Sequence, residues 1–205
     1  IRNAPHFFSS KPQALNKIGI FLLHMAQKDY KLEIVLDLIR GNTHLRGVAS
    51  HLSINHMMVA RKMKDLVREN VVDFRVEGKN KIFFLKKTIE AKNYVFSAES
   101  YKLNALLKKY PSLRQIVEKV QMDKRIKLAI LFGSYAKGIA KEESDVDIYI
   151  DTNDKNIKES LSLVNSKLSI KIGKYNKSSL LIKEIEKNKV IIKGIELYYE
   201  KNNFL

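Results

Sequence analysis

Two short apolar segments enclose a polar stretch whose ends carry distinctive residues. The first segment, residues 127–132, runs into Gly133 and Ser134, and ten residues later Asp145 and Asp147 open the second. Apolar runs of this length, bounded by turn residues, are typical of buried strands. A chain that contains both must place them in a sheet and cover the faces of that sheet with other elements.

The residues at the ends of this stretch suit phosphate and metal chemistry. Side chains two apart in a strand point to one face, so Asp145 and Asp147 are predicted to project together. Paired carboxylates repel each other and favour a shared Mg²⁺, which prefers carboxylate and phosphate oxygens. Gly133 lets backbone amides approach a phosphate, Ser134 adds a hydroxyl and Lys137 adds charge. The combination suits two-metal phosphoryl or nucleotidyl transfer.

The C-terminal half alternates between strand and helix patterns. Such alternation predicts an α/β layer structure. The expected strands are residues 127–132, 146–151, 168–172 and 191–199. The expected helices are residues 111–121, 155–167 and 177–188.

The N-terminal half shows a different order, with three short helices followed by a hairpin. Thr43 and Asn55 are the predicted N-caps of the second and third helices. Gly78 lies in a short polar connector between two alternating runs, which is a hairpin signal. The expected helices are residues 30–40, 43–51 and 55–70, and the expected strands are 71–76 and 81–86. Residues 88–110 then read as a long connecting helix.

The C-terminal half resembles the nucleotidyltransferase superfamily typified by DNA polymerase beta, and in particular its minimal prokaryotic members. The resemblance spans roughly residues 112–200, and Lys137 stands where arginine is common. The positions that match in register are Gly133, Ser134, Ala136, Gly138, Ser144, Asp145 and Asp147. The resemblance implies that Asp145 and Asp147 are catalytic metal ligands. It also implies that the Gly133-Ser134 turn holds a nucleoside triphosphate.

One departure from that family concerns a third carboxylate. Active members supply it from a neighbouring strand, where it ligates metal and accepts the proton of the attacking hydroxyl. The corresponding strand, residues 168–172, contains no acid, and Lys171 is a candidate for that place. Asp151 lies four residues beyond Asp147 and is a poor substitute. Glu184 and Glu196 are interpreted as a solvated helix position and a polar strand position.

Residues 45–74 resemble the helix-turn-helix of prokaryotic winged-helix regulators. In such folds the recognition helix enters the major groove, and its N-terminal residues meet base edges. Asn55 and His56 are therefore the candidate base readers. The other candidate DNA-binding residues, mainly for phosphate contacts, are Arg61, Lys62, Lys64, Lys79 and Lys81. Helix-turn-helix units also serve as protein-interaction modules, which is the alternative interpretation.

Composition limits the remaining possibilities. The net charge of +16 attracts polyanions, although lysine is frequent throughout the chain. There are no cysteines, which excludes thiolate zinc sites and disulfides and fits a cytoplasmic location. The five histidines show no metal-binding spacing, and no apolar run has the length of a membrane span.

Together these patterns predict an α+β fold, with a winged helix (three helices plus a β-hairpin) followed by a small α/β nucleotidyltransferase domain with a mixed sheet. The expected boundaries are an extension at 1–24, with Met25 as an alternative start, the winged helix at 25–88, a helical linker at 89–111 and the second domain at 112–205. The expected function is Mg²⁺-dependent nucleotidyl transfer coupled to binding of duplex DNA. The alternative is a non-catalytic regulator or antitoxin-like protein that binds nucleotide, a HEPN-type partner or a second copy of itself.

Overall fold

The computed structural model describes residues 28–163 and 165–204. The expectations for residues 1–24 and for Met25 lie outside the described residues. Within these ranges no helix combines the length and the apolar character needed to cross a bilayer.

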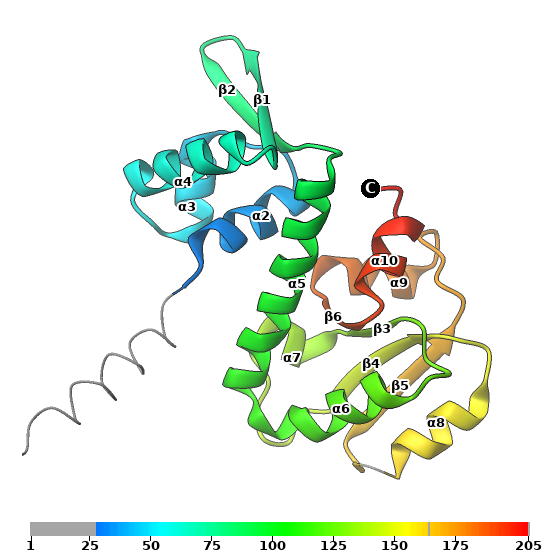
Figure 1. Cartoon of the computed structure of the whole chain (residues 1–205). Coiled ribbons are helices and arrows are strands. Elements are labelled where there is room, and N and C mark those ends of the chain that lie inside the picture. Colours follow the sequence, from blue (N-terminus) through cyan, green and yellow to red (C-terminus); the bar gives the residue numbers. More distant parts are fainter. Residues whose placement is uncertain (1–27, 164, 205) are drawn as a thin grey trace, which may run out of the picture.

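The N-terminal domain has the predicted order of three helices and a hairpin (Figure 1). Asp29 caps the first helix, because its side chain accepts hydrogen bonds from the backbone N–H groups of Lys31 and Leu32. Gly78, with a φ of 60°, forms the tight turn of the wing. The elements are α2 (Tyr30–Arg40), α3 (Leu45–Leu52), α4 (His56–Arg68), β1 (Val72–Glu77) and β2 (Asn80–Leu85).

The predicted cap of the second helix is wrong. Thr43 forms a β-bridge with Phe83 of β2, in which the Phe83 N–H donates to the Thr43 carbonyl at 2.8 Å. His44 takes the N-cap position and makes no side-chain capping bond. The backbone of Thr43 is thus used to attach the wing to the start of α3.

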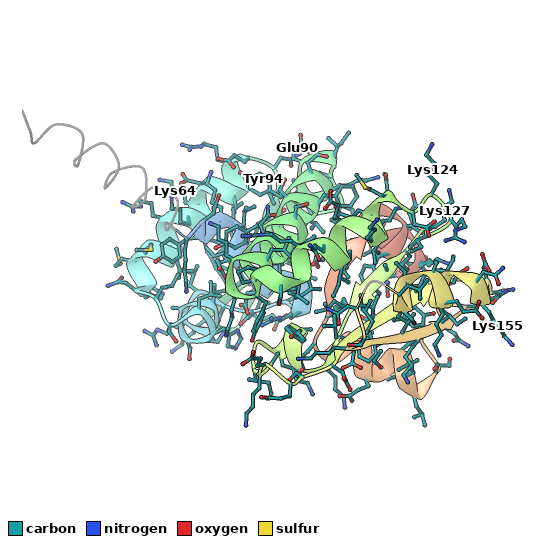
Figure 2. All side chains as sticks on the ribbon, turned by 90° about the horizontal axis from the view of Figure 1, so that it is seen from below. Lys64, Glu90, Tyr94, Lys124, Lys127 and Lys155 are labelled. Carbon is teal, nitrogen blue, oxygen red and sulfur yellow. The ribbon has the colours of Figure 1, made fainter. Side chains whose placement is uncertain are left out.

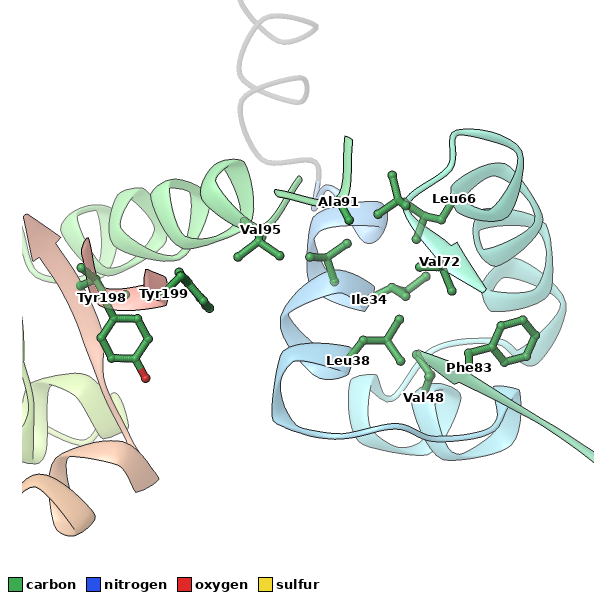
Figure 3. Packing of buried hydrophobic residues seen from close by; sticks show 14 of the residues in the cluster. Ile34, Leu38, Val48, Leu66, Val72, Phe83, Ala91, Val95, Tyr198 and Tyr199 are labelled. Atoms are coloured by element: carbon green, nitrogen blue, oxygen red, sulfur yellow. The ribbon is translucent and has the colours of Figure 1, made fainter. Parts of the chain in front are cut away.

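The apolar positions of the three helices meet in one core (Figure 3). The recognition helix α4 buries Val59, Met63 and Leu66, the three positions that its helical spacing predicts. Ile34 and Leu38 of α2 face them across the domain. This packing fixes which side of α4 remains exposed.

The long helix α5 (Ile89–Lys109) connects the two domains and packs against both (Figure 1). The Thr88 side chain caps it by accepting from the N–H of Ala91 at 3.2 Å. Its first half adds Ala91 and Val95 to the winged-helix core, and its second half adds Leu103 to the core of the second domain. The connecting helix is therefore part of both cores.

The second domain is a four-stranded mixed sheet with the strand order β5-β4-β3-β6. Strand β3 is antiparallel to both neighbours, whereas β4 and β5 are parallel. The strands are β3 (Ala129–Leu131), β4 (Val146–Asp151), β5 (Leu168–Gly173) and β6 (Val190–Lys193). The helices are η1 (Pro111–Leu113), α6 (Arg114–Met122), α7 (Gly133–Lys137), α8 (Lys155–Ser162), α9 (Leu180–Lys187) and α10 (Ile195–Lys201).

Side-chain alternation in β4 divides the core into two layers. Ile148 and Ile150 belong to the cluster that α6 and α8 cover, whereas Tyr149 belongs to the cluster with α9 and α10. Asp147 alternates with Ile148 and therefore lies on the Tyr149 side of the sheet. The candidate site is consequently on the face that α9 and α10 partly cover.

The predicted final strand, residues 191–199, is wrong in its second half. Strand β6 ends at Lys193, because Gly194 adopts a φ of 78° and a Cβ there would lie 2.2 Å from the Lys127 carbonyl oxygen. The chain continues as α10, which buries Tyr198 and Tyr199. Adjacent aromatic residues fit a buried helix as well as a strand, so periodicity alone misassigned them.

Candidate functional site

Gly133 contacts Asp147 closely. Its φ is 70°, and a Cβ at this position would lie 2.2 Å from Oδ2 of Asp147. The Phe132 N–H also donates to the Asp147 carbonyl at 3.0 Å. The predicted turn is in fact the short helix α7, which ends at Gly138 with a φ of 73°. The structure thus brings the Gly-Ser segment and the second carboxylate together.

The two carboxylates differ in exposure. Asp147 is half-buried inside β4, whereas Asp145 immediately precedes the strand and is exposed. Asp147 lies on the Tyr149 side of the sheet, and Asp145 lies two residues before it, where the chain enters β4. The pair can therefore reach one ligand at the edge of the domain.

Ser134 and Lys137 complete the predicted residues of this site. Ser134 is half-buried as the second residue of α7, and Lys137 is exposed as its last residue. The Lys137 ammonium lies 4.0 Å from Oε1 of Glu184 on α9. A hydrogen bond from Lys187 holds the pKa of Glu184 below its usual range. Glu184 therefore remains ionised, and its negative charge partly offsets the positive charge of Lys137.

The place opposite Asp147 on the neighbouring strand is occupied by Ser169. In the parallel register of β4 and β5, Ser169 pairs with Asp147, and Lys171 pairs with Tyr149. Lys171, the residue considered for the third-acid place, thus lies beside Tyr149, two residues beyond the register partner of Asp147. Across residues 28–163 and 165–204, no three acidic or histidine side chains gather into a metal-binding group.

The other acids considered have structural partners. Asp151 accepts a hydrogen bond from the Tyr175 N–H at 3.0 Å and forms an ion pair with Lys201 at 3.1 Å. Glu196 lies on α10, not on a strand as predicted, and pairs with Lys92 at 3.0 Å. These contacts leave Asp145 and Asp147 as the acids available at the site.

The chemistry of this donor set fits one Mg²⁺ bound together with a triphosphate. Mg²⁺ retains several waters and is usually held by one or two carboxylates plus substrate phosphates. Asp145 and Asp147 would supply the carboxylates, and Ser134 and Gly133 lie beside them for the phosphates. A second metal would need a further acid, and Ser169 stands at the adjacent register position.

The recognition helix presents a mostly basic face. Asn55, one candidate base reader, is exposed and also caps α4, because its Oδ1 accepts from the Met57 N–H at 2.7 Å. His56 is exposed at the first helical position. Opposite the buried positions, the helical period places Met57, Arg61, Lys64 and Arg68. Lys62 is half-buried at the side of the helix.

Two residues of that face, Met57 and Arg68, were missed by the sequence analysis. The Met57 side chain is 73% exposed, and several other large apolar side chains of the described residues are also exposed. Arg68 pairs with Asp65 at 3.1 Å and remains largely exposed. Both could have been found by extending the spacing of the buried residues around the helix.

The wing carries the two predicted lysines. Lys79 lies in the exposed turn after Gly78. The ammonium of Lys81 lies 4.0 Å from the centre of the Phe74 ring, a cation–π contact that positions the side chain on the hairpin. Arg75 pairs with Glu77 at 2.6 Å.

Fold and site together define a two-domain protein, in which a winged helix is joined to a small α/β domain of nucleotidyltransferase type. Residues 114–201 match the family described as polymerase beta, nucleotidyltransferase. The C-terminal part of the chain is thus a polymerase-beta-type nucleotidyltransferase domain.

Solved structures similar to the chain include two bacterial repressors. The transcriptional repressor BigR from Xylella fastidiosa is 16% identical, with a TM-score of 0.31, covering 50% of this chain and 91% of its own. The adhesin competence repressor AdcR from Streptococcus pyogenes is 20% identical, with a TM-score of 0.36, covering 52% and 85%. No curated protein matches the sequence. The winged-helix assignment rests on the three helices and the hairpin themselves.

Proposed function

We propose that this chain binds duplex DNA through its winged helix and binds a Mg²⁺-nucleoside triphosphate at Gly133, Ser134, Asp145 and Asp147. The observation that carries the proposal is the contact between Gly133 and the Asp147 carboxylate. It joins a segment suited to phosphates and a carboxylate suited to a cation in one place. The basic faces of α4 and the wing support the DNA-binding half of the proposal.

Each residue has a defined part in nucleotide binding. The Ser134 hydroxyl and the backbone at Gly133 meet phosphate oxygens, and Lys137 adds positive charge from the end of α7. Asp145 and Asp147 hold the cation that neutralises the triphosphate. When bound, Mg²⁺ would also polarise the phosphoryl group as a Lewis acid.

A non-catalytic role is the second candidate, and Ser169 is the observation that favours it. Nucleotidyl transfer requires an acceptor hydroxyl to attack the α-phosphorus, lose its proton and displace pyrophosphate. Ser169 pairs with Asp147 where a carboxylate could accept that proton. The Ser169 side chain is a weak base. We therefore propose that transfer is slow and that the domain mainly binds nucleotide without transferring it.

Calorimetry with a non-hydrolysable triphosphate and Mg²⁺ tests the nucleotide site. The variants Asp145→Asn and Asp147→Asn keep the side-chain size, and each should weaken Mg²⁺-dependent binding by about tenfold or more. Asp151→Asn is the matched control, because Asp151 lies on the same strand but is held by Tyr175 and Lys201. Equal affinity for the Mg²⁺-triphosphate in all three variants and the wild type would contradict the proposed site.

A further inference from the structure

A cavity of about 420 Å³ lies between the two domains. Its walls come from α2 of the winged helix, from α5, from Ala136 of α7 and from residues 186–189, which comprise the end of α9 and the two residues that follow it. None of the four residues of the proposed triphosphate site is among its lining residues. Its volume falls in the range of small-molecule sites, which is roughly 300–1,000 Å³.

Glu99 of α5 lines this cavity, and one of its carboxylate oxygens is unsatisfied. The residue is only 2% exposed. Its Oε1 accepts a hydrogen bond from the Tyr199 hydroxyl at 2.7 Å, while its buried Oε2 has no hydrogen-bond partner among the described residues. A buried charged oxygen without a donor is costly, and such atoms are rare in folded proteins.

The other acid in the cavity wall, Glu186, has a hydrogen-bond donor for each of its carboxylate oxygens. Glu186 accepts hydrogen bonds from the hydroxyl groups of Tyr175 and Tyr198, at 2.8 and 2.7 Å. It also pairs with Lys189 at 2.9 Å. The protein thus supplies three donors to Glu186 and only one to the more deeply buried Glu99.

Two cations of the wall, Arg40 and Lys102, form no direct ion pair among the described residues. A third cation of the wall, Lys187, does have a partner, because it pairs with Glu184 at 2.7 Å. In the part of the chain that the structure describes, no carboxylate lies within ion-pair distance of Arg40 or Lys102. Burial lowers the pKa of Lys102, and the nearby charge of Glu99 opposes that shift. Arg40 comes from α2 and Lys102 from α5, so both helices contribute positive charge that is not held in a direct ion pair.

These observations together define the chemistry of a ligand. An anion alone would match Arg40 and Lys102 but leave Oε2 of Glu99 without a donor. A simple cation would match Glu99 and be repelled by the two basic residues. A molecule with an anionic group and, a few bonds away, a hydroxyl or amino donor would satisfy all three.

We propose that the interdomain cavity binds a small phosphate ester with a hydroxyl or amino group, of the size of a nucleoside monophosphate or a pentose phosphate. Its phosphate faces Arg40 and Lys102, and its donor group approaches the Glu99 carboxylate, whose buried Oε2 must turn toward the cavity to accept the hydrogen bond. The inference is independent of the triphosphate site. Because the walls belong to both domains, occupancy holds α2 against the nucleotidyltransferase domain.

Calorimetry without Mg²⁺, on the Asp145→Asn, Asp147→Asn double variant, tests this cavity apart from the triphosphate site. The probes are AMP, GMP, CMP, UMP, ribose 5-phosphate and inorganic phosphate, and the relative affinities show whether the base or the sugar supplies the donor. At least one ester should bind with a Kd below about 1 mM, the weak end of specific binding. Failure of every ester to bind at that level would overturn the proposal.

Variants of the wall locate the bound ester. Lys102→Met removes a half-buried charge and fills nearly the same volume, so the fold should persist, and binding should weaken by about tenfold. Lys155→Met on α8, outside the cavity, is the matched control and should have no effect. Glu99→Gln keeps an acceptor for Tyr199, and it should weaken binding of the ester but not of inorganic phosphate. Ester binding that is unchanged by Lys102→Met and by Glu99→Gln would place the ligand elsewhere and overturn the proposal.

Discussion

Two constraints coincide at Gly133. The residue adopts a φ of 70°, in the left-handed region that glycine tolerates best, and it leaves no room for a Cβ beside Asp147. Either constraint alone would select glycine for the fold. Their combination ties the backbone of the phosphate segment to the position of a carboxylate.

Gly133→Ala should therefore affect both stability and binding. The left-handed backbone and the displaced Asp147 together should cost about 1–3 kcal/mol in the free energy of unfolding, measured by urea denaturation. The same variant should lose Mg²⁺-dependent triphosphate binding. Gly41→Ala is the control, because Gly41 is extended and a Cβ there meets no atom within 4 Å. Full binding by Gly133→Ala would contradict the proposed contact.

The residue that limits catalysis in this account is Ser169. Ser169→Asp would place a carboxylate in register with Asp147, where it can accept the proton of an attacking hydroxyl. Labelled nucleotide incubated with cell extract should give more labelled product, by about 100-fold, the lower end of general base catalysis. The neutral Ser169→Asn variant should stay at the wild-type rate. Rapid transfer by the wild type, or no gain in the aspartate variant, would contradict the assignment.

Among the elements, the recognition helix shows what sequence spacing can and cannot predict. Its buried residues follow directly from the helical period, and the outward face follows from them. The role of Asn55 is less simple, because its side chain also caps the helix. Asn55→Ser, which can still cap, is thus a better test of base reading than Asn55→Ala.

The salt dependence of DNA binding tests the basic face of α4. Log affinity falls with log salt at a slope of about −0.9 per phosphate neutralised. Replacing Arg61 and Lys64 with alanine should flatten that slope by about 1.8 units if each contacts one phosphate. The control is the double alanine variant of Lys155 and Lys158 on α8, at the far end of the molecule from Lys64 (Figure 2). Equal slopes for both double variants would argue against α4 as the DNA-binding element.

The errors of sequence reasoning have local physical causes. The expected cap at Thr43 was wrong because the backbone of that residue bridges to Phe83, a contact between segments 40 residues apart. The final strand was wrong because the close approach of Gly194 to Lys127 breaks it. The residue opposite Asp147 depends on the parallel register of β4 and β5, which no local pattern specifies. By contrast, the Gly-Ser and Asp-x-Asp residues lie within one short segment. Their spacing is visible in the sequence, so they could be predicted as site residues.

At the scale of the whole molecule, one apolar cluster crosses the domain boundary. Ile34 and Leu66 of the winged helix and Tyr199 of α10 belong to the same cluster, which Val95 of α5 joins (Figure 3). The Tyr199 hydroxyl also donates to Glu99 of α5 at 2.7 Å. The two domains therefore share packing and a buried hydrogen bond.

Shared packing predicts that the two domains unfold together in one cooperative transition. Tyr199→Phe would leave both oxygens of Glu99 unpaired and should cost about 1–3 kcal/mol in the free energy of unfolding. Tyr30→Phe removes a hydroxyl from the first residue of α2 and serves as the control. Urea denaturation followed by circular dichroism and by tyrosine fluorescence measures the effect. Two separate transitions in the wild type would show that the domains are energetically independent.

The central claim is that Gly133, Ser134, Asp145 and Asp147 form one nucleotide site, and a crystal soaked with Mn²⁺ and a non-hydrolysable triphosphate tests it most directly. Mn²⁺ takes the oxygen sites that suit Mg²⁺ and is visible by its anomalous scattering. The account predicts an anomalous peak between Asp145 and Asp147, with the phosphates against Gly133 and Ser134. A triphosphate bound elsewhere, with no metal beside the two carboxylates, would contradict it.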